Sequence, residues 1–174
     1  MMKARDYGLD PAHFLRYVIR PTLPRIALDS PSAQVQVLGI GLVESGLRWL
    51  DQLDKRTMPG PAYGLYGMEK ATHDDLWSFL RAKIALRLSV GRLSLYSGFQ
   101  SPPDVTELWA NLAYATAMCR VKVYRAPPAL PDATDALGHA NYHKVFYNTM
   151  AGATVVSESV KHFEFAVRCV ADTK

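Results

Sequence analysis

The sequence has few cysteines and no long apolar run, and each absence limits what the protein can be. Of its 174 residues only Cys119 and Cys169 are cysteines, and they lie in separate segments without the spacing of a metal site. We therefore expect buried free thiols, with a disulfide between them as the alternative. No segment reaches the roughly 18 consecutive apolar residues of a membrane span. The N-terminal Met-Met-Lys-Ala-Arg-Asp lacks the apolar core of a signal peptide, so neither a membrane span nor general secretion is expected.

A strong excess of one charge is absent as well. The formal net charge is +4, which suits contact with an anionic polymer such as a bacterial cell wall. It falls short of the clustered basic stripe of a nucleic-acid-binding protein, so nucleic acid is not an expected partner. Hydrophobic residues make up 49% and charged residues 21% of the chain, as in ordinary globular proteins. At this length, and with no internal repeat, we expect a single domain over residues 1–174.

The most informative stretch is an apolar segment that ends in a carboxylate. Ser30 is suited to cap the start of a helix, and Pro31 to occupy its first turn. Apolar residues then fall on every face of this helix, which predicts that it is buried. Gly46 marks its expected end and leaves Glu44 in the last turn. The negative end of the helix dipole and apolar walls both favour a protonated carboxyl group, which suits a general acid.

The other patterns predict a mainly α fold with one small strand or turn segment. Further helices are expected from residue 10 until prolines interrupt the chain at Pro21 and Pro24, and over about 72–86, 105–124, 136–147 and 153–174. The helix from Thr72 has a capping box with Asp75. Its inward stripe is Leu76, Phe79, Leu80, Ile84 and Leu88, and its solvated face carries Arg81, Lys83 and Arg87.

The segment between these helices is expected to complete the surroundings of Glu44. Residues 47–63 contain several charged residues, prolines and a glycine, and are predicted to form a long exposed loop. Loops of this length are often functional. Residues 63–68 contain two glycines and predict a short strand or turn packed against the helix that ends in Glu44.

Glu44-Ser45 at the expected helix end is followed by Gly64-Leu65 and then by Ala71-Thr72. This order resembles the lytic transglycosylases and goose-type lysozymes, in which a helix-terminal Glu-Ser pair is followed by Gly-Leu-Met-Gln and then by Pro-x-Thr or Ala-Thr. The run Gly-Pro-Ala-Tyr-Gly-Leu-Tyr-Gly-Met-Glu over 60–69 also resembles small phage peptidoglycan transglycosylases. The likeness covers about residues 34–152, with a catalytic core over 28–152 and a packing helix over 153–174. The family's sugar-holding Gln is replaced by Gly67.

A third signature of that family is Tyr-Asn followed by Gly, in which the Tyr reaches the catalytic Glu. Tyr147-Asn148 with Gly152 is similar, with a wider gap, and Tyr142 competes for the role of the tyrosine. An aromatic helix face packed in the core is the alternative. The resemblance thus implies a lysozyme-like (α+β) domain with Glu44 as catalytic residue. The residues it implies for substrate binding are Ser45, Gly64, Leu65, Tyr66, Tyr142, Tyr147 and Asn148.

The implied reaction is cleavage of peptidoglycan between N-acetylmuramic acid and N-acetylglucosamine. Glu44 would protonate the linking oxygen and then accept the proton of the sugar's C6 hydroxyl, which closes an anhydro ring. An inverting lysozyme would instead need a second carboxylate about 6.5–9.5 Å away to position water. Glu69 is the best candidate because it sits within the segment that the resemblance implies to form the groove, and Asp51 and Asp54 are the others.

Two further classes stay open. A structural virion protein of the tail or internal core, with a lysozyme-like fold and little activity, would also account for Gly67. A zinc hydrolase would use His139 and His143, which are spaced to share one helix face but lack the Glu of the metalloprotease motif. We expect no cofactor and no metal. The expected partners are peptidoglycan and other phage virion proteins, and the expected location is a virion, or the host cytoplasm before release to the periplasm.

Overall fold

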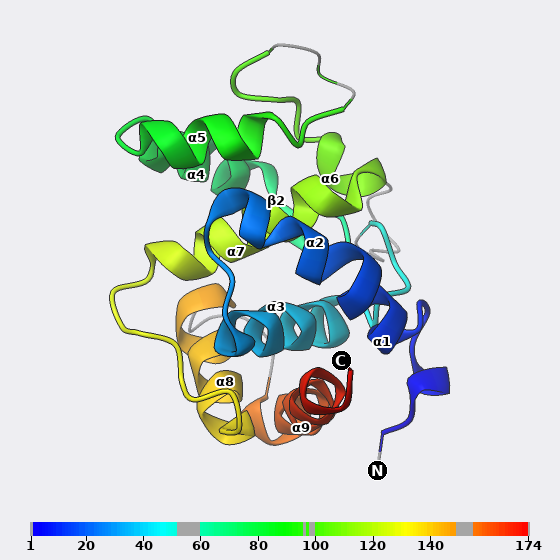
Figure 1. Ribbon diagram of the computed structural model, residues 1–174. Coiled ribbons are helices and arrows are strands. Elements are labelled where there is room, and N and C mark those ends of the chain that lie inside the picture. Colours follow the sequence, from blue (N-terminus) through cyan, green and yellow to red (C-terminus); the bar gives the residue numbers. More distant parts are fainter. Residues whose placement is uncertain (1, 52–59, 96, 98–99, 149–154, 174) are drawn as a thin grey trace.

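The computed structural model describes residues 2–51, 60–95, 97, 100–148 and 155–173, which form a mainly helical fold with a two-stranded sheet (Figure 1). The helices are α1 (Pro11–Phe14), α2 (Arg20–Thr22), α3 (Pro31–Glu44), α4 (Lys70–Leu80), α5 (Ile84–Gly91), α6 (Glu107–Ala110), α7 (Leu112–Arg125), α8 (Ala136–Tyr142) and α9 (Val156–Asp172). The π-helical turns η2 (Leu15–Ile19) and η4 (His143–Tyr147) extend α1 and α8. Short 3-10 turns are η1 (Ala4–Asp6) and η3 (Pro24–Ile26).

Helix α3 is the central element, as its sequence predicts. The Ser30 side chain accepts a hydrogen bond from the Ala33 N–H, and Pro31 is the first helical residue. The helix is buried from residue 33 to residue 42, because it is surrounded by η2, α7, α8 and α9 (Figure 1). Helix α9 approaches it very closely at Gly39, where an added Cβ would lie only 2.2 Å from the Phe163 ring. Any larger residue would push the two helices apart.

The helix expected over 72–86 is two helices, so that prediction was wrong in its boundaries. Helix α4 begins at Lys70, two residues before the expected Thr72 cap, and it ends at Leu80. A turn follows, and α5 then packs on the protein through a different set of side chains, of which Val90 is fully buried. As a result Ile84 and Leu88, expected to point inward, are 64% and 51% exposed.

Two other helix boundaries also differ from the prediction. Pro21 does not interrupt the first helix, since the π turn before it, closed by the Arg20 N–H donating to the Leu15 carbonyl, leaves a wider backbone for the proline ring. The helix expected over 105–124 is divided at Asn111. The Asn111 side chain caps α7 by accepting from the Tyr114 N–H, which fixes where the second helix begins.

The small sheet confirms the predicted strand or turn segment beside Glu44. Strands β1 (Ala62–Tyr63) and β2 (Met68–Glu69) are antiparallel, and the turn between them is closed by the Gly67 N–H donating to the Gly64 carbonyl. Both glycines have positive φ, +71° and +57°, which favours glycine. Gly64 also lies against the Leu108 carbonyl oxygen, where a Cβ would be 2.2 Å away. Much of the expected 47–63 loop, residues 52–59, lies outside the described residues.

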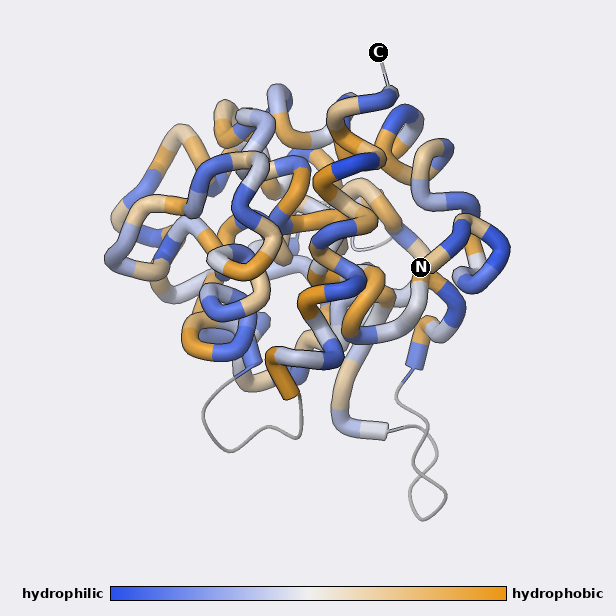
Figure 2. The backbone as a smooth tube through the Cα atoms, turned by 90° about the horizontal axis from the view of Figure 1, so that it is seen from below, coloured by the Kyte–Doolittle hydropathy of each residue, from blue (hydrophilic) through white to orange (hydrophobic). Residues whose placement is uncertain are grey.

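Helix α9 confirms the predicted C-terminal packing helix. It packs on α3 and α8 through Phe163 and Ala166, which are fully buried. Cys169 on α9 and Cys119 on α7 are buried free thiols, as expected. Figure 2 shows hydrophobic and hydrophilic residues interleaved along the helices, as is typical of helices that bury one side. Among the described residues, no helix is long and apolar enough to cross a membrane.

Candidate active site

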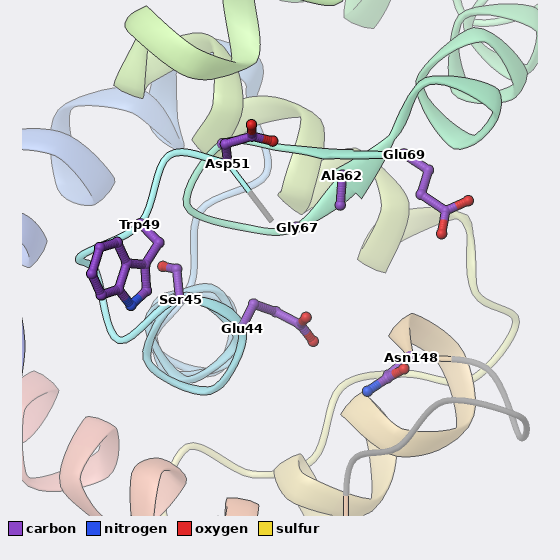
Figure 3. A pocket seen from close by; sticks show the side chains of 9 residues that line it. Glu44, Ser45, Trp49, Asp51, Ala62, Gly67, Glu69 and Asn148 are labelled. Atoms are coloured by element: carbon purple, nitrogen blue, oxygen red, sulfur yellow. The ribbon is translucent and has the colours of Figure 1, made fainter. Parts of the chain in front are cut away.

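Glu44 ends α3 at the wall of an open pocket of about 370 Å³. The pocket is lined by Glu44, Ser45, Trp49, Asp51, Ala62, Gly64, Gly67, Glu69 and Asn148. Figure 3 shows the Glu44 side chain leaving the helix end and extending between the sheet and Asn148. Its side chain is 20% exposed, so the carboxylate is reachable from solvent although the rest of α3 is buried. A second, smaller pocket of about 160 Å³ continues past Glu44 toward Thr72, Lys122 and Tyr147.

One oxygen of the Glu44 carboxyl group is held by a buried histidine. His143 is fully buried, and its Nε2 lies 2.7 Å from Glu44 Oε1. The other ring nitrogen, Nδ1, is buried without a hydrogen-bond partner among the described residues. An unfilled N–H donor in the interior is less favourable than an unfilled acceptor. The arrangement therefore favours the tautomer in which Nε2–H donates to Oε1 and Nδ1 carries no proton.

The π turn η4 is what places His143 beside Glu44. Its wider winding is closed by the Asn148 N–H, which donates to the His143 carbonyl five residues earlier at 2.9 Å. His143, Tyr147 and Asn148 all lie on the side of the turn that faces Glu44. His143 contacts the Glu44 carboxyl group, and Tyr147 and Asn148 line the smaller pocket. Single π turns inside helices are frequent at functional sites.

The other carboxylate oxygen faces Gly67. A Cβ added to Gly67 would lie 3.1 Å from Glu44 Oε2, closer than ordinary van der Waals contact. The positive φ of +57° is a second reason for glycine at this position. The replacement of the family's Gln by Gly67 thus has a structural explanation here, because a side chain would crowd the oxygen that faces the pocket.

Tyr147 supports the turn that contains Gly67. Its hydroxyl donates to the Tyr66 carbonyl at 2.8 Å, and its ring stacks on the His143 ring at a centroid distance of 5.7 Å. Burial raises the pKa of its phenol, so it stays protonated as a donor. The expectation that this tyrosine reaches the acid is corrected in one respect: its hydroxyl donates to the backbone of the neighbouring turn. It therefore fixes the position of Gly67 relative to Glu44.

Lys122 is a cation that the sequence did not single out. Its Nζ lies 3.7 Å from the centre of the Tyr147 ring, and the side chain lines the smaller pocket with Glu44 and Glu69. Burial lowers the pKa of this amine, and the negative charge of Glu44 acts in the opposite direction. Lys122 thus brings a partly desolvated positive charge close to the carboxylate.

The three candidates for a second carboxylate have different placements. Glu69 is exposed and lines both pockets with Glu44, from strand β2. Asp51 lines the larger pocket, but Figure 3 shows its carboxylate directed away from Glu44. Asp54 lies outside the described residues. Glu69 is thus the described acid best placed to act on something bound beside Glu44.

Three residues expected at the substrate are instead part of the core. Leu65 and Tyr66 are each only 2% exposed, and the Tyr66 hydroxyl bonds with Thr116 Oγ1 on α7 at 3.0 Å. Tyr142 lines neither pocket beside Glu44, because its hydroxyl donates to the Val123 carbonyl at 3.0 Å. Their aromatic and aliphatic surface is used for packing, so we correct their assignment from substrate binding to structure.

Ser45 and Gly64 lie at the pocket wall with structural contacts of their own. The Ser45 hydroxyl donates to the Gly41 carbonyl at 3.2 Å and accepts from the Leu47 N–H at 3.1 Å, which terminates α3. Gly64 donates its N–H to the Leu50 carbonyl at 2.8 Å. Both residues hold the shape of the pocket, and the backbone of each lies where a ligand could meet it.

Trp49 and His143, like Lys122, lie near Glu44 although the sequence did not predict them at its site. Trp49 is 47% exposed at the pocket edge, on the side of Glu44 opposite Asn148 (Figure 3). The available signal was a tryptophan within residues 47–63, the segment predicted to form a long exposed loop. His143 was considered only as a zinc ligand, and nothing local in the sequence indicates its contact with a residue 99 positions away.

The zinc alternative receives no support from the positions of the two histidines. His139 Nδ1 bonds with Gln36 Oε1 at 2.7 Å and its Nε2 with the Asp132 carbonyl at 3.1 Å, so both its nitrogens are engaged. His143 points to Glu44. Within the described part of the chain no group of three His, Cys, Asp or Glu side chains could hold a metal ion.

Comparisons with protein-family models, with curated proteins and with solved structures give no match for this chain. Any function proposed for it therefore depends on the chemistry of the pocket around Glu44 and on the motifs that surround it.

Proposed function

We propose that this chain is a lysozyme-like lytic transglycosylase of phage type, which cleaves peptidoglycan between N-acetylmuramic acid and N-acetylglucosamine. The observation that carries the proposal is the arrangement of Glu44. One of its oxygens is held by His143, and the other faces an open pocket past Gly67. A carboxyl group fixed in this way can present a single oxygen to a bound glycosidic bond.

In the first step Glu44 Oε2 gives its proton to the oxygen that links the two sugars. The bond between that oxygen and C1 of muramic acid then breaks, and positive charge develops on C1 and the ring oxygen. In the second step the Glu44 carboxylate accepts the proton of the C6 hydroxyl, whose oxygen bonds to C1. The anhydro ring closes and Glu44 is again protonated. His143 Nε2–H donates to Oε1 in both steps, so it orients the acid without having to change its own protonation.

The other lining residues suit a sugar chain. Trp49 offers an exposed aromatic face against which the apolar side of a pyranose ring can stack, and Asn148 offers an amide on the other side of Glu44. The pocket is open at the surface, which a long polymer requires because it must enter from the side. A hydrolytic, lysozyme-type reaction would use Glu69 to position water in the same pocket.

The test is the mass of the soluble fragments released from purified cell wall. A transglycosylase adds no water, so each new terminus would be an anhydro-muramic end about 18 mass units lighter than a hydrolysed end. We expect the lighter product. Ends of normal mass would assign a hydrolase and give Glu69 the role of base. If walls from several hosts released no fragments over a range of pH, the proposal would fail in favour of a structural virion protein with this fold.

A further inference from the structure

Helix α5 presents apolar and basic side chains together on the outside of the molecule. It lies at the outer edge, at the opposite end from α9 (Figure 1), and packs on α4, α7 and η3. Val90 anchors its inner side. Its outer side exposes Ile84 and Leu88, four residues apart, and Leu95 beyond the helix end is 69% exposed. Large aliphatic side chains are therefore exposed to solvent along α5 and just beyond its end.

The same segment is strongly one-sided in charge. Between Asp75 and Asp104 the sequence contains no acidic residue, and its basic residues there are Arg81, Lys83, Arg87 and Arg92. None of the four forms an ion pair with a carboxylate in the described part of the chain. Two of them lie beside an apolar side chain, because Arg87 and Arg92 line one groove of about 590 Å³ together with Leu88. We call Arg81, Lys83, Ile84, Arg87, Leu88, Arg92 and Leu95 the α5 surface.

We infer that the α5 surface docks on an anionic lipid bilayer. Phosphate headgroups would pair with the four cations, and the aliphatic side chains would enter the boundary between headgroups and acyl chains. A second copy of this chain fits less well, because a symmetric contact would place the cations of one copy against those of the other. Nucleic acid would engage the cations alone and leave Ile84, Leu88 and Leu95 without a partner.

Docking through α5 would be independent of the pocket around Glu44. None of the residues of the α5 surface lines either pocket beside the acid. The inference therefore does not depend on the proposed reaction. An enzyme held in this way would work on polymer lying next to a membrane.

The test is co-sedimentation of the full chain with lipid vesicles. We expect binding to vesicles of phosphatidylcholine mixed with phosphatidylglycerol, weakened by added salt, and little binding to phosphatidylcholine alone. Ile84→Ser with Leu88→Ser should weaken binding by about tenfold or more, since two buried aliphatic side chains are lost. The matched control is Leu9→Ser with Leu137→Ser, which removes aliphatic side chains that are 43% and 56% exposed elsewhere. It should bind as the parent does.

A second pair of variants tests the charge. Arg81→Gln with Lys83→Gln should weaken binding to the anionic vesicles by about tenfold, and Lys3→Gln with Lys161→Gln, equal in net charge, should have little effect. All these positions are exposed, so thermal unfolding should be unchanged. Absent binding, equal binding to both vesicle types, or equal effects of the α5 and control variants would overturn the inference. Self-association abolished by Ile84→Ser, without vesicle binding, would replace the lipid by a second copy.

Discussion

His143 Nε2 lies 2.7 Å from Glu44 Oε1, and the opposite ring nitrogen of His143 is buried without a partner among the described residues. Within the described residues the histidine thus has one hydrogen-bond partner, and it joins the end of α3 to the π turn after α8. Such a hydrogen bond contributes about 0.5–1.5 kcal/mol when Glu44 is protonated and about 1.5–3 kcal/mol when it is a carboxylate, so in both states it favours one direction of the carboxyl group.

Removing the donor should reduce turnover on peptidoglycan more than substrate binding. We expect His143→Leu to lower kcat by roughly tenfold or more, because the carboxyl group loses its orientation, and to leave KM close to that of the parent. His143→Gln retains an N–H donor in the side chain and should recover part of the loss. Initial rates of fragment release measure both. Equal rates for the Leu and Gln variants would show that the donor has no part in orienting Glu44.

The acid itself is tested by Glu44→Gln. This variant should abolish fragment release and keep the melting temperature near that of the parent or slightly above it, because active-site carboxylates often reduce stability. Glu69→Gln is the matched control from the same pocket. A transglycosylase should keep most of its rate in Glu69→Gln, whereas an inverting hydrolase should lose it. Release that persists in Glu44→Gln would exclude Glu44 as the acid.

Substitutions at Gly67 should have two effects, backbone strain and crowding of the Glu44 carboxyl group, which a control at Gly46 can distinguish. Gly67→Gln and Gly67→Ala should both lower the free energy of unfolding by about 1–2 kcal/mol, because φ is positive, and should also lower activity by crowding Oε2. Gly46→Ala is the control, since Gly46 has a φ of +60° and no atom within 4 Å of an added Cβ. It should lose similar stability and keep its activity. A gain in activity in Gly67→Gln would instead mean that the family's amide can be accommodated.

Trp49 should contribute to sugar binding and little to the fold. It is 47% exposed at the pocket edge, so Trp49→Ala should raise KM for glycan fragments several-fold and hardly change thermal unfolding. Leu50→Ala, at a neighbouring position that is also 47% exposed and does not line the pocket, is the control. If both variants bind fragments as tightly as the parent, the sugar does not stack on Trp49.

Acid should destabilise the protein below about pH 6.5. Burial lowers the pKa of His73, His139 and His162 below the ordinary value of 6.5. Between each lowered pKa and 6.5 the unfolded chain binds protons that the folded chain does not, so the free energy of unfolding falls as pH falls through this window. Urea unfolding at several pH values measures the slope. His139→Gln should make the slope smaller, and an unchanged slope would exclude a contribution from this histidine.

The sequence predicted the parts of the site that depend on short-range chemistry. Ser30 and Pro31 begin α3 because capping and a fixed φ act within one turn, and the apolar residues on every face of α3 require burial wherever the helix lies. The paired glycines before β2 likewise predicted a turn beside Glu44. The sequence prediction of helix boundaries was wrong after Leu80. The helical pattern of apolar residues continues there, but the chain makes a turn between α4 and α5.

By itself, the sequence determined that a buried helix would end in the carboxylate of Glu44, because cap, apolar run and terminating glycine all lie within one continuous segment. The tertiary structure decided what that carboxylate meets. His143 is 99 residues away, and it reaches Oε1 only through a π turn that no local pattern indicated. The role of Gly67 also follows from the fold, since the crowding that any Cβ there would impose on Oε2 arises only when the sheet packs against the end of α3. Contacts between distant segments depend on how whole elements pack, and periodicity within each element does not encode them.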